Sequence, residues 1–376
     1  MPTTLSEQVL ELALAIQQIP APTFQEEKRA AFIRERFLAE GFADVAIDEA
    51  GNVYARLPGS GQARPLVVSA HLDTVFPIAT SLQAACEPER ITAPGIGDNS
   101  LGLAGLFGLA WALKQEPVSP LPGDVWLAAD VGEEGLGDLR GMKAVVERFG
   151  EEPIAYIVLE GMSLGRVYHR GLGVQRYRIT VRTPGGHSWV DSGQPSAIHE
   201  LAILVTQLNG LALPEQPRTT LNAGIIQGGT SVNTIAAEAH LELDLRSEDV
   251  KTLAESAGQV ERLVAAANRP KVEVSAQVIG QRPAGEINPD HPLVRLGLSC
   301  LVKQGLQPTL NIGSTDANIP LSRGLPAICI GLTSGGGAHT INEYILTQPL
   351  AQGLAQLVDV VRGTFTLNEN QELFHP

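Results

Sequence analysis

Cysteine, aromatic residues and basic charge are all scarce in this sequence of 376 residues. Its three cysteines, Cys86, Cys300 and Cys329, lie far apart and match no metal-ligand spacing, so a disulfide-stapled miniprotein is excluded and reduced core thiols are expected. Aromatic residues make up 5% and charged residues 18%, whereas hydrophobic residues make up 44%. This balance excludes intrinsic disorder and fibrous repeats.

Basic residues are too few for a nucleic-acid partner, because 27 lysines and arginines face 41 acidic residues and leave a net charge of −14. No apolar run approaches the roughly 18–20 residues that cross a bilayer, so no membrane association is expected. The N-terminal stretch carries Glu7 and Glu11 within a helical pattern, unlike the basic-then-apolar order of a signal peptide. These features predict a cytoplasmic protein.

Helical and strand patterns alternate in the first part of the chain and again after Pro283. Amphipathic helices are expected at 5–17 and 26–40, and apolar strands such as PLVVSAHLDTV, DVWLAADV and PIAYIVLE alternate with helices at 101–114 and 139–148. Such alternation predicts an α/β domain with a mostly parallel sheet that helices cover on both faces.

Residues 175–284 follow a different order. A strand, a helix at 196–209, the two strands TTLNAGIIQG and TIAAEAHLELDLR, a helix at 250–268 and a last strand form a βαββαβ pattern. This order is typical of a split βαβ, or ferredoxin-like, domain. We therefore expect a small domain inserted into a larger one that is formed by residues 1–174 and 285–376.

Histidines and carboxylates gather at the ends of the predicted strands and in the glycine-rich loops GIGDNSLG and TSGGGAH. These side chains are His71, Asp73, Asp98, Glu133, Glu134, Glu160 and His339. Because ligands of an open α/β sheet bind outside the carboxyl ends of its strands, we expect these side chains to lie close together.

So many carboxylates in one cleft would repel one another unless cations neutralised them. Mixed histidine and carboxylate ligands suit zinc or a similar divalent ion. Two such ions about 3.5–4 Å apart, sharing a hydroxide, are the usual arrangement for metal-assisted hydrolysis. The adjacent Glu133 and Glu134 fit a division of roles, since one can bind metal while the other reaches the attacking water.

Five segments resemble, in order and rough spacing, the motifs of the M20 family of dinuclear zinc peptidases and N-acyl amidohydrolases. They are HLDTV (71–75), GIGDN (95–99), GEEG (132–135), LEG (159–161) and GAHTINE (337–343). The inserted βαββαβ segment is similar to that family's lid, or dimerisation, domain. The resemblance covers nearly the whole chain, and it implies a homodimer that forms through the lid.

The resemblance also implies two divalent metal ions per chain, with zinc favoured and cobalt or manganese as alternatives. The implied ligands are His71 and Glu160 for one metal, Glu134 and His339 for the other, and Asp98 as the bridge. Asp73 resembles the carboxylate that fixes the His71 ring. Glu133 resembles the general base that takes a proton from the bridging water and passes it to the leaving amine.

The lid segment supplies three more candidates. His187 in TPGGHSW resembles a lid histidine that polarises the scissile carbonyl as an oxyanion donor, in its own chain or in the partner's site. Asn233 and Arg246 resemble residues that hold the substrate backbone or its terminal carboxylate. Asn233 could instead be a turn residue, and Arg246 could cap a strand end. The resemblance also places Asp316 of GSTDAN beside the active site and leaves its role open.

The substrate is predicted only in outline. The glutamate at position 160 resembles the residue found in the carboxypeptidase and deacylase branches of the family. The segments SVNTIAAEA and GSTDAN, however, also resemble segments of tripeptidases. We therefore expect hydrolysis of a peptide or N-acyl amide bond that releases an amino acid with a free carboxylate, with an aminopeptidase of the same family as the alternative.

Two other classes of protein compete with this interpretation. Ser163 lies in a G-x-S-x-G pattern, but a nucleophile elbow must run straight into a helix, and strand periodicity follows here. A metal-binding protein without catalysis is disfavoured because every ligand position and the base position are filled.

Overall fold

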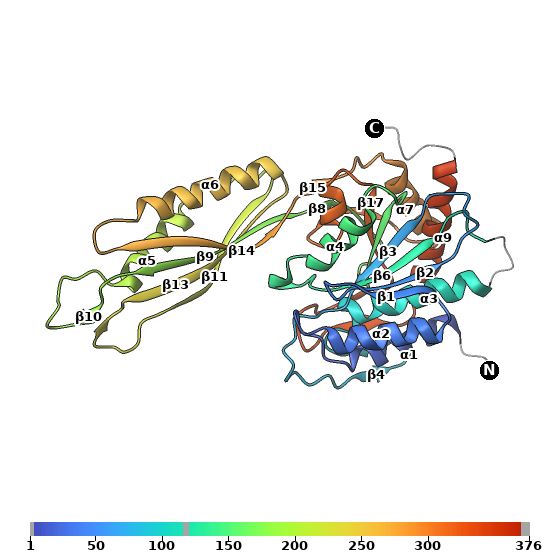
Figure 1. Ribbon diagram of the computed structural model, residues 1–376, viewed down its shortest axis with the longest axis horizontal. Coiled ribbons are helices and arrows are strands. Elements are labelled where there is room, and N and C mark those ends of the chain that lie inside the picture. Colours follow the sequence, from blue (N-terminus) through green and yellow to red (C-terminus); the bar gives the residue numbers. More distant parts are fainter. Residues whose placement is uncertain (1–3, 116–119, 370–376) are drawn as a thin grey trace. The chain divides into compact units, whose positions relative to one another are not determined.

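The computed structural model describes residues 4–115 and 120–369, which fold into two compact units (Figure 1). The larger unit comprises the chain up to Gly171 and again from Glu286, and the smaller unit comprises Leu172–Gly285. Within the described ranges, every helix falls short of the length or the apolar character that a membrane crossing requires.

The larger unit is built on one nine-stranded sheet with the order β1-β2-β6-β3-β7-β17-β8-β15, in which β16 pairs with β8. Its strands are β1 (Ala43–Ile47), β2 (Val53–Leu57), β3 (Leu66–His71), β6 (Val125–Asp130), β7 (Tyr156–Glu160), β8 (Arg166–Gly171), β15 (Gly285–Glu286), β16 (Thr309–Gly313) and β17 (Ala327–Gly331). The central strands β6, β3, β7 and β17 run parallel to one another. The strand β2 runs antiparallel to both of its neighbours, β1 and β6. The carboxyl ends of the central strands therefore meet at one edge of the sheet.

Helices pack against both faces of this sheet, and Figure 1 shows α1, α2 and α3 on one side and α4 on the other. The helices are α1 (Leu5–Gln17), α2 (Glu27–Ala39), α3 (Leu101–Gln115), α4 (Arg140–Phe149), α7 (Pro292–Lys303), α8 (Asn318–Ser322) and α9 (Leu350–Glu369). Phe37 of α2 stacks on Phe107 of α3 with ring centroids 4.7 Å apart, and Phe149 of α4 packs on Trp126 of β6 at 5.3 Å. The predicted α/β fold with a mostly parallel, doubly covered sheet is confirmed.

A small antiparallel sheet of order β18-β19-β5-β4 was not predicted from the sequence. Its strands are β4 (Ala85–Glu87), β5 (Arg90–Thr92), β18 (Gly335–Gly336) and β19 (Tyr344–Leu346), which are too short to show an alternating pattern. Because β18 pairs with β19, this sheet closes the loop of residues 337–343 that carries His339.

The smaller unit has an antiparallel sheet of order β11-β13-β9-β14 together with the helices α5 and α6, in the predicted βαββαβ order. Its elements are β9 (Gly173–Arg182), β10 (Gly186–His187), α5 (Ala197–Asn209), β11 (Thr219–Gly228), β12 (Thr234–Ile235), β13 (Glu238–Ser247), α6 (Val250–Ala266) and β14 (Glu273–Arg282). Alternate residues such as Ile179 of β9 and Leu243 of β13 are buried in one core with Leu204 of α5 and Val260 of α6.

The prediction of one continuous strand over TIAAEAHLELDLR is wrong in one respect. In the structure this segment is interrupted at Ala236 and Ala237 and forms two strands, β12 and β13. The Ala236 carbonyl accepts hydrogen bonds from the Ala197 N–H and the Thr183 hydroxyl, and the Ala237 carbonyl accepts the Thr183 N–H, each at 2.8 Å. These bonds replace ladder bonds, so β12 turns away and pairs with β10 instead. The pairing of β10 with β12 forms the end of the unit that carries His187.

Candidate metal centre

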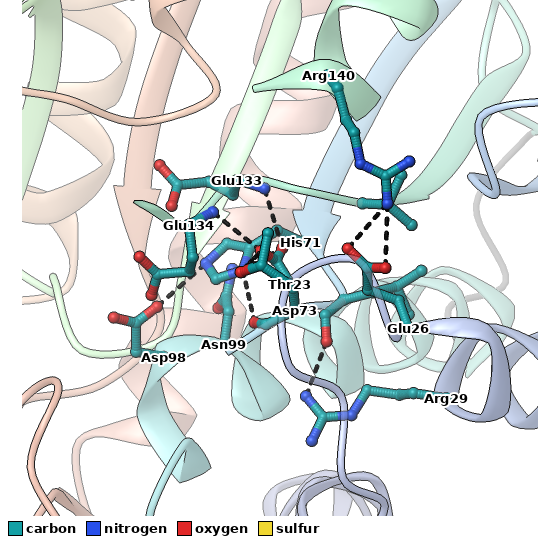
Figure 2. Close-up of polar contacts among 12 residues, drawn as sticks. Thr23, Glu26, Arg29, His71, Asp73, Asp98, Asn99, Glu133, Glu134 and Arg140 are labelled. Atoms are coloured by element: carbon teal, nitrogen blue, oxygen red, sulfur yellow. Dashed lines mark hydrogen bonds and ion pairs between the residues drawn. The ribbon is translucent and has the colours of Figure 1, made fainter. Parts of the chain in front are cut away.

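Asp98 lies between two histidines at the carboxyl edge of the large sheet. Its Oδ1 is 3.1 Å from Nε2 of His71, and its Oδ2 is 3.1 Å from Nε2 of His339. Oε1 of Glu134 lies 3.1 Å from the same His339 nitrogen. Figure 2 shows the Asp98 and Glu134 carboxylates beside the His71 ring. One carboxylate thus faces two imidazoles that come from β3 and from the loop between β18 and β19.

Two three-residue clusters share this carboxylate. His71, Asp98 and Glu160 offer ligand atoms that all lie within 4.8 Å of one another, and so do Asp98, Glu134 and His339. The structure therefore brings together all five side chains that the sequence suggested as ligands. Two clusters with one shared carboxylate match the geometry of a two-metal site.

The donor atoms fit divalent cations in a second way. Nε2 of His71 and Oε1 of Glu134 are buried, and each faces another candidate ligand at 3.1 Å, Asp98 for His71 and His339 for Glu134. Carboxylates packed this closely repel one another, and a divalent cation would neutralise that charge while binding these donor atoms. Imidazole nitrogens combined with carboxylate oxygens are the donor set that zinc prefers.

Protons and cations compete for these side chains. Hydrogen bonds with Asp98 and Glu134 raise the pKa of His339 to about 10. Burial raises the pKa of Glu160 well above its usual value. Burial alone would also raise the pKa of Asp98, but hydrogen bonds with His339 and His71 hold that pKa below its usual value. Because metal ligands must be deprotonated, metal binding at this site should release protons and weaken as the pH falls.

The Asp73 carboxylate holds the loop that carries Glu133 and Glu134. Its two oxygens accept the N–H groups of Glu133 and Glu134, each at 2.9 Å, and the hydroxyl of Thr23 at 2.8 Å (Figure 2). Nδ1 of His71 lies 3.0 Å from the backbone carbonyl oxygen of Asp73 and 3.6 Å from its Oδ1. The backbone carbonyl of Asp73 is thus closer to the ring than the carboxylate is, and the carboxylate mainly orders the neighbouring loop.

Glu343 and Asn99 position the ligands, although sequence reasoning assigned neither of them this role. The buried Glu343 carboxylate accepts the N–H groups of Gly95, Gly97 and Asp98 at 3.2, 2.8 and 2.9 Å, so it holds the turn that presents Asp98. The Asn99 side chain donates to the Leu159 carbonyl at 2.8 Å and accepts the Gly161 N–H at 3.1 Å. These two bonds fix the backbone on both sides of Glu160.

A buried pair of carboxyl groups lies beside the metal centre. Asp130 ends β6 opposite His71 in the sheet register, and the buried Asp316, whose role the sequence left open, is close enough for the two carboxyl groups to influence each other's pKa. Burial raises the pKa of Asp130 to about 7. Burial also raises the pKa of Asp316 well above its usual value, and repulsion by Asp130 and Glu133 adds to this effect. Two carboxyl groups in such a site share a proton rather than both ionise.

The three candidates of the smaller unit lie at two different places. His187 and Asn233 share one end of the unit, where the Ser188 N–H donates to the Asn233 carbonyl at 3.0 Å. Arg246 lies near the other end of β13, opposite Val174 of β9, and its Nε donates to Asp244 at 2.8 Å. The structure thus brings Asn233 to His187 but not Arg246.

The G-x-S-x-G pattern around Ser163 does not form a nucleophile elbow. The strand β8 follows it, as predicted, and not a helix. The Ser163 hydroxyl lies 3.4 Å from that of Tyr168. A serine nucleophile at this position therefore lacks its structural context.

Comparisons with known proteins agree with this geometry. The sequence model described as peptidase family M20/M25/M40 matches residues 67–363. The uncharacterized protein YqjE of Bacillus subtilis is 24% identical and covers 94% of this chain and 98% of its own. The acetylornithine deacetylase of Erwinia tasmaniensis is 27% identical over 80% of this chain and 81% of its own.

Solved structures share the fold. A tripeptidase from Staphylococcus aureus superposes with a TM-score of 0.80 at 21% identity, covering 96% of this chain and 99% of its own. The YXEP protein of Bacillus subtilis, described as a dinuclear metal-binding peptidase of the M20 family, gives a TM-score of 0.68 at 16% identity and covers 97% and 99%.

Proposed function

This chain belongs to peptidase family M20/M25/M40, whose members are metal-dependent hydrolases of amide bonds, and we propose that it releases an amino acid with a free carboxylate from a small peptide or an N-acyl amino acid. The observation that carries the proposal is the Asp98 carboxylate shared by two ligand clusters, beside the adjacent Glu133. Two divalent cations held there, zinc by preference and cobalt or manganese as alternatives, would polarise the scissile carbonyl and lower the pKa of a water molecule.

Glu133 is the proposed general base. Its backbone N–H is held by Asp73, and it directly precedes the proposed ligand Glu134, so it lies next to the reacting atoms without belonging to either ligand cluster. Figure 2 shows its carboxylate apart from those of Glu134 and Asp98. In this role Glu133 takes a proton from the attacking water and passes it to the leaving nitrogen.

The leaving group is proposed to be an amino acid with a free carboxylate. Glutamate at position 160 and the deacetylase relative, whose name implies release of an amino acid, support this direction of cleavage. Arg246 is the proposed partner of the carboxylate, because a guanidinium binds a carboxylate through two parallel hydrogen bonds. The tripeptidase structure supports the alternative, an aminopeptidase that requires a free substrate amine.

A metal measurement and a substrate panel test this proposal. Protein purified with zinc supplied is expected to contain about two ions per chain, to lose activity on chelation and to regain it with zinc or cobalt. In a mass-spectrometric screen, N-blocked di- and tripeptides and N-acyl amino acids with free carboxylates should be hydrolysed, and C-terminal amidation should abolish cleavage. A metal content near zero would refute the metal site, whereas cleavage of peptides with a free amine alone would select the aminopeptidase.

We further propose a homodimer in which His187 completes the partner's active site. From Glu238 to Arg246 the strand β13 spans about 26 Å at about 3.3 Å per residue, with Arg246 near one end and His187 beyond the other. A tripeptide is only about 10 Å long. The separation of the two residues within one chain exceeds the length of such a substrate, which supports a site that combines Arg246 of one chain with His187 of the other.

Complementation tests this arrangement. His187→Ala and Glu133→Ala chains, each nearly inactive alone, are mixed under conditions that exchange subunits. A mixed dimer would combine an intact Glu133 with an intact His187 from the other chain in one of its two sites. Since half of the dimers are mixed, recovery should approach a quarter of wild-type activity. Absence of recovery despite exchange verified by mass spectrometry would place His187 in its own chain's site or outside catalysis.

A further inference from the structure

His187 begins a tight turn that its own side chain stabilises. Its carbonyl accepts the Asp191 N–H at 2.9 Å, and its ring Nδ1 accepts the N–H groups of Trp189 and Val190 at 3.2 and 3.3 Å. In return, Oδ2 of Asp191 accepts the N–H of His187 at 2.7 Å. The side chains at the two ends of the turn thus satisfy the backbone N–H groups of His187, Trp189 and Val190, much as side chains do in a helix capping box.

This turn determines where the ring carries its proton. A neutral imidazole has one N–H and one acceptor nitrogen, and a nitrogen that accepts backbone N–H groups cannot be the protonated one. We infer that Asp191 is a positioning residue that holds the turn and thereby keeps His187 in the tautomer with its proton on Nε2. The inference rests on the proposed function, in which His187 donates a hydrogen bond to the substrate oxyanion.

Hydrogen bonds stabilise this turn, because its large apolar side chains are not buried and contribute no hydrophobic packing. Trp189 is 85% exposed and Val190 is 76% exposed, so neither contributes to a core. The preceding Gly186 has φ 148°, and a Cβ at this position would lie 2.8 Å from Cβ and Oδ2 of Asp191. The backbone therefore approaches the Asp191 side chain more closely than any residue with a side chain would allow.

The tautomer matters for catalysis because only a ring with its proton on Nε2 can donate from that atom. A neutral imidazole that donates to a developing oxyanion acts as a fixed dipole, and removing one such donor typically costs about 10²–10³-fold in kcat. Loss of the Asp191 carboxylate would leave the ring free to rotate and to exchange tautomers. Part of this factor should then be lost although His187 itself is present.

Asp191→Ala, Asp191→Asn and the control Asp249→Ala test the inference. The control removes a carboxylate that caps α6 in the same unit, where Asp249 accepts the Thr252 N–H at 2.7 Å. In protein labelled with ¹⁵N-histidine, long-range ¹H–¹⁵N correlation spectra report the tautomer, and the His187 signals are assigned by their loss in His187→Gln. This measurement requires no turnover.

Wild type, Asp191→Asn and Asp249→Ala should show the pattern of a proton on Nε2, since asparagine keeps an acceptor oxygen at position 191. Asp191→Ala should show mixed tautomers, and its kcat on a substrate identified by the panel should fall by about tenfold or more with little change in KM.

Retention of the Nε2–H pattern and of kcat in Asp191→Ala would overturn the inference. If His187→Gln itself keeps full kcat, the oxyanion role fails instead, while the tautomer result stands separately. If circular dichroism shows that Asp191→Ala misfolds, Asp191→Leu takes its place, because leucine is similar in size to aspartate and lacks an acceptor oxygen; mixed tautomers are again expected, and a retained Nε2–H pattern would again overturn the inference.

Discussion

Replacing Glu133 with glutamine is expected to lower kcat by about 10²–10⁴-fold while the protein keeps its metal ions. Glutamine has nearly the same size and shape, but its side-chain amide cannot take a proton from water. The backbone N–H of residue 133 would still donate to Asp73, so the loop should stay in place. The measurements are steady-state kinetics, metal content by mass spectrometry and the thermal unfolding temperature.

The matched control is Glu134→Gln, which makes the same chemical change one residue further on. Because Glu134 belongs to a ligand cluster with Asp98 and His339, this variant should lose metal as well as activity. A Glu133→Gln variant with wild-type kcat would assign the base to another residue. One that loses metal in the same way as Glu134→Gln would show that Glu133 is a ligand.

The sequence predicted the parts of the site that depend on local pattern. The buried run of β3 and the apolar runs of β6 and β7 set where each strand ends, and in a parallel sheet those ends meet at one edge. His71 and Glu160 therefore could be placed together without knowledge of any long-range contact. The strand and helix patterns of residues 175–284 likewise indicated the βαββαβ order of the smaller unit.

The positioning residues could not be predicted, because their roles depend on contacts between distant parts of the chain. Glu343 holds the N–H of Gly97, which lies 246 residues earlier, and Asn99 reaches the Leu159 carbonyl across 60 residues. In the sequence such residues are ordinary polar positions in loops. They differ from other polar residues because they are buried and form hydrogen bonds with backbone N–H and C=O groups of distant segments. Such burial is a property of the folded chain.

Removing the Asp98 carboxylate should have the largest effect on metal binding, since it is the side chain common to both clusters. Changes in the residues that support a ligand typically weaken metal affinity by about 10–100-fold, which is the effect expected for Asp73→Asn. Asp98→Ala removes a donor from both sites at once, so each ion should be bound more than about 100-fold more weakly. The metal content should fall from about two ions per chain to near zero, and hydrolysis should be lost with it.

His339→Ala is the matched control for Asp98→Ala, because His339 belongs to only one of the two clusters. This variant should keep one ion, held by His71, Asp98 and Glu160, and competition titrations with a chelator should show one tight site where wild type shows two. Two ions retained in Asp98→Ala would mean that the carboxylate bridges nothing. Loss of both ions in His339→Ala would mean that the two metal ions bind only together. The bridging role of Asp98 would then be tested by the affinity of the protein for the first ion alone.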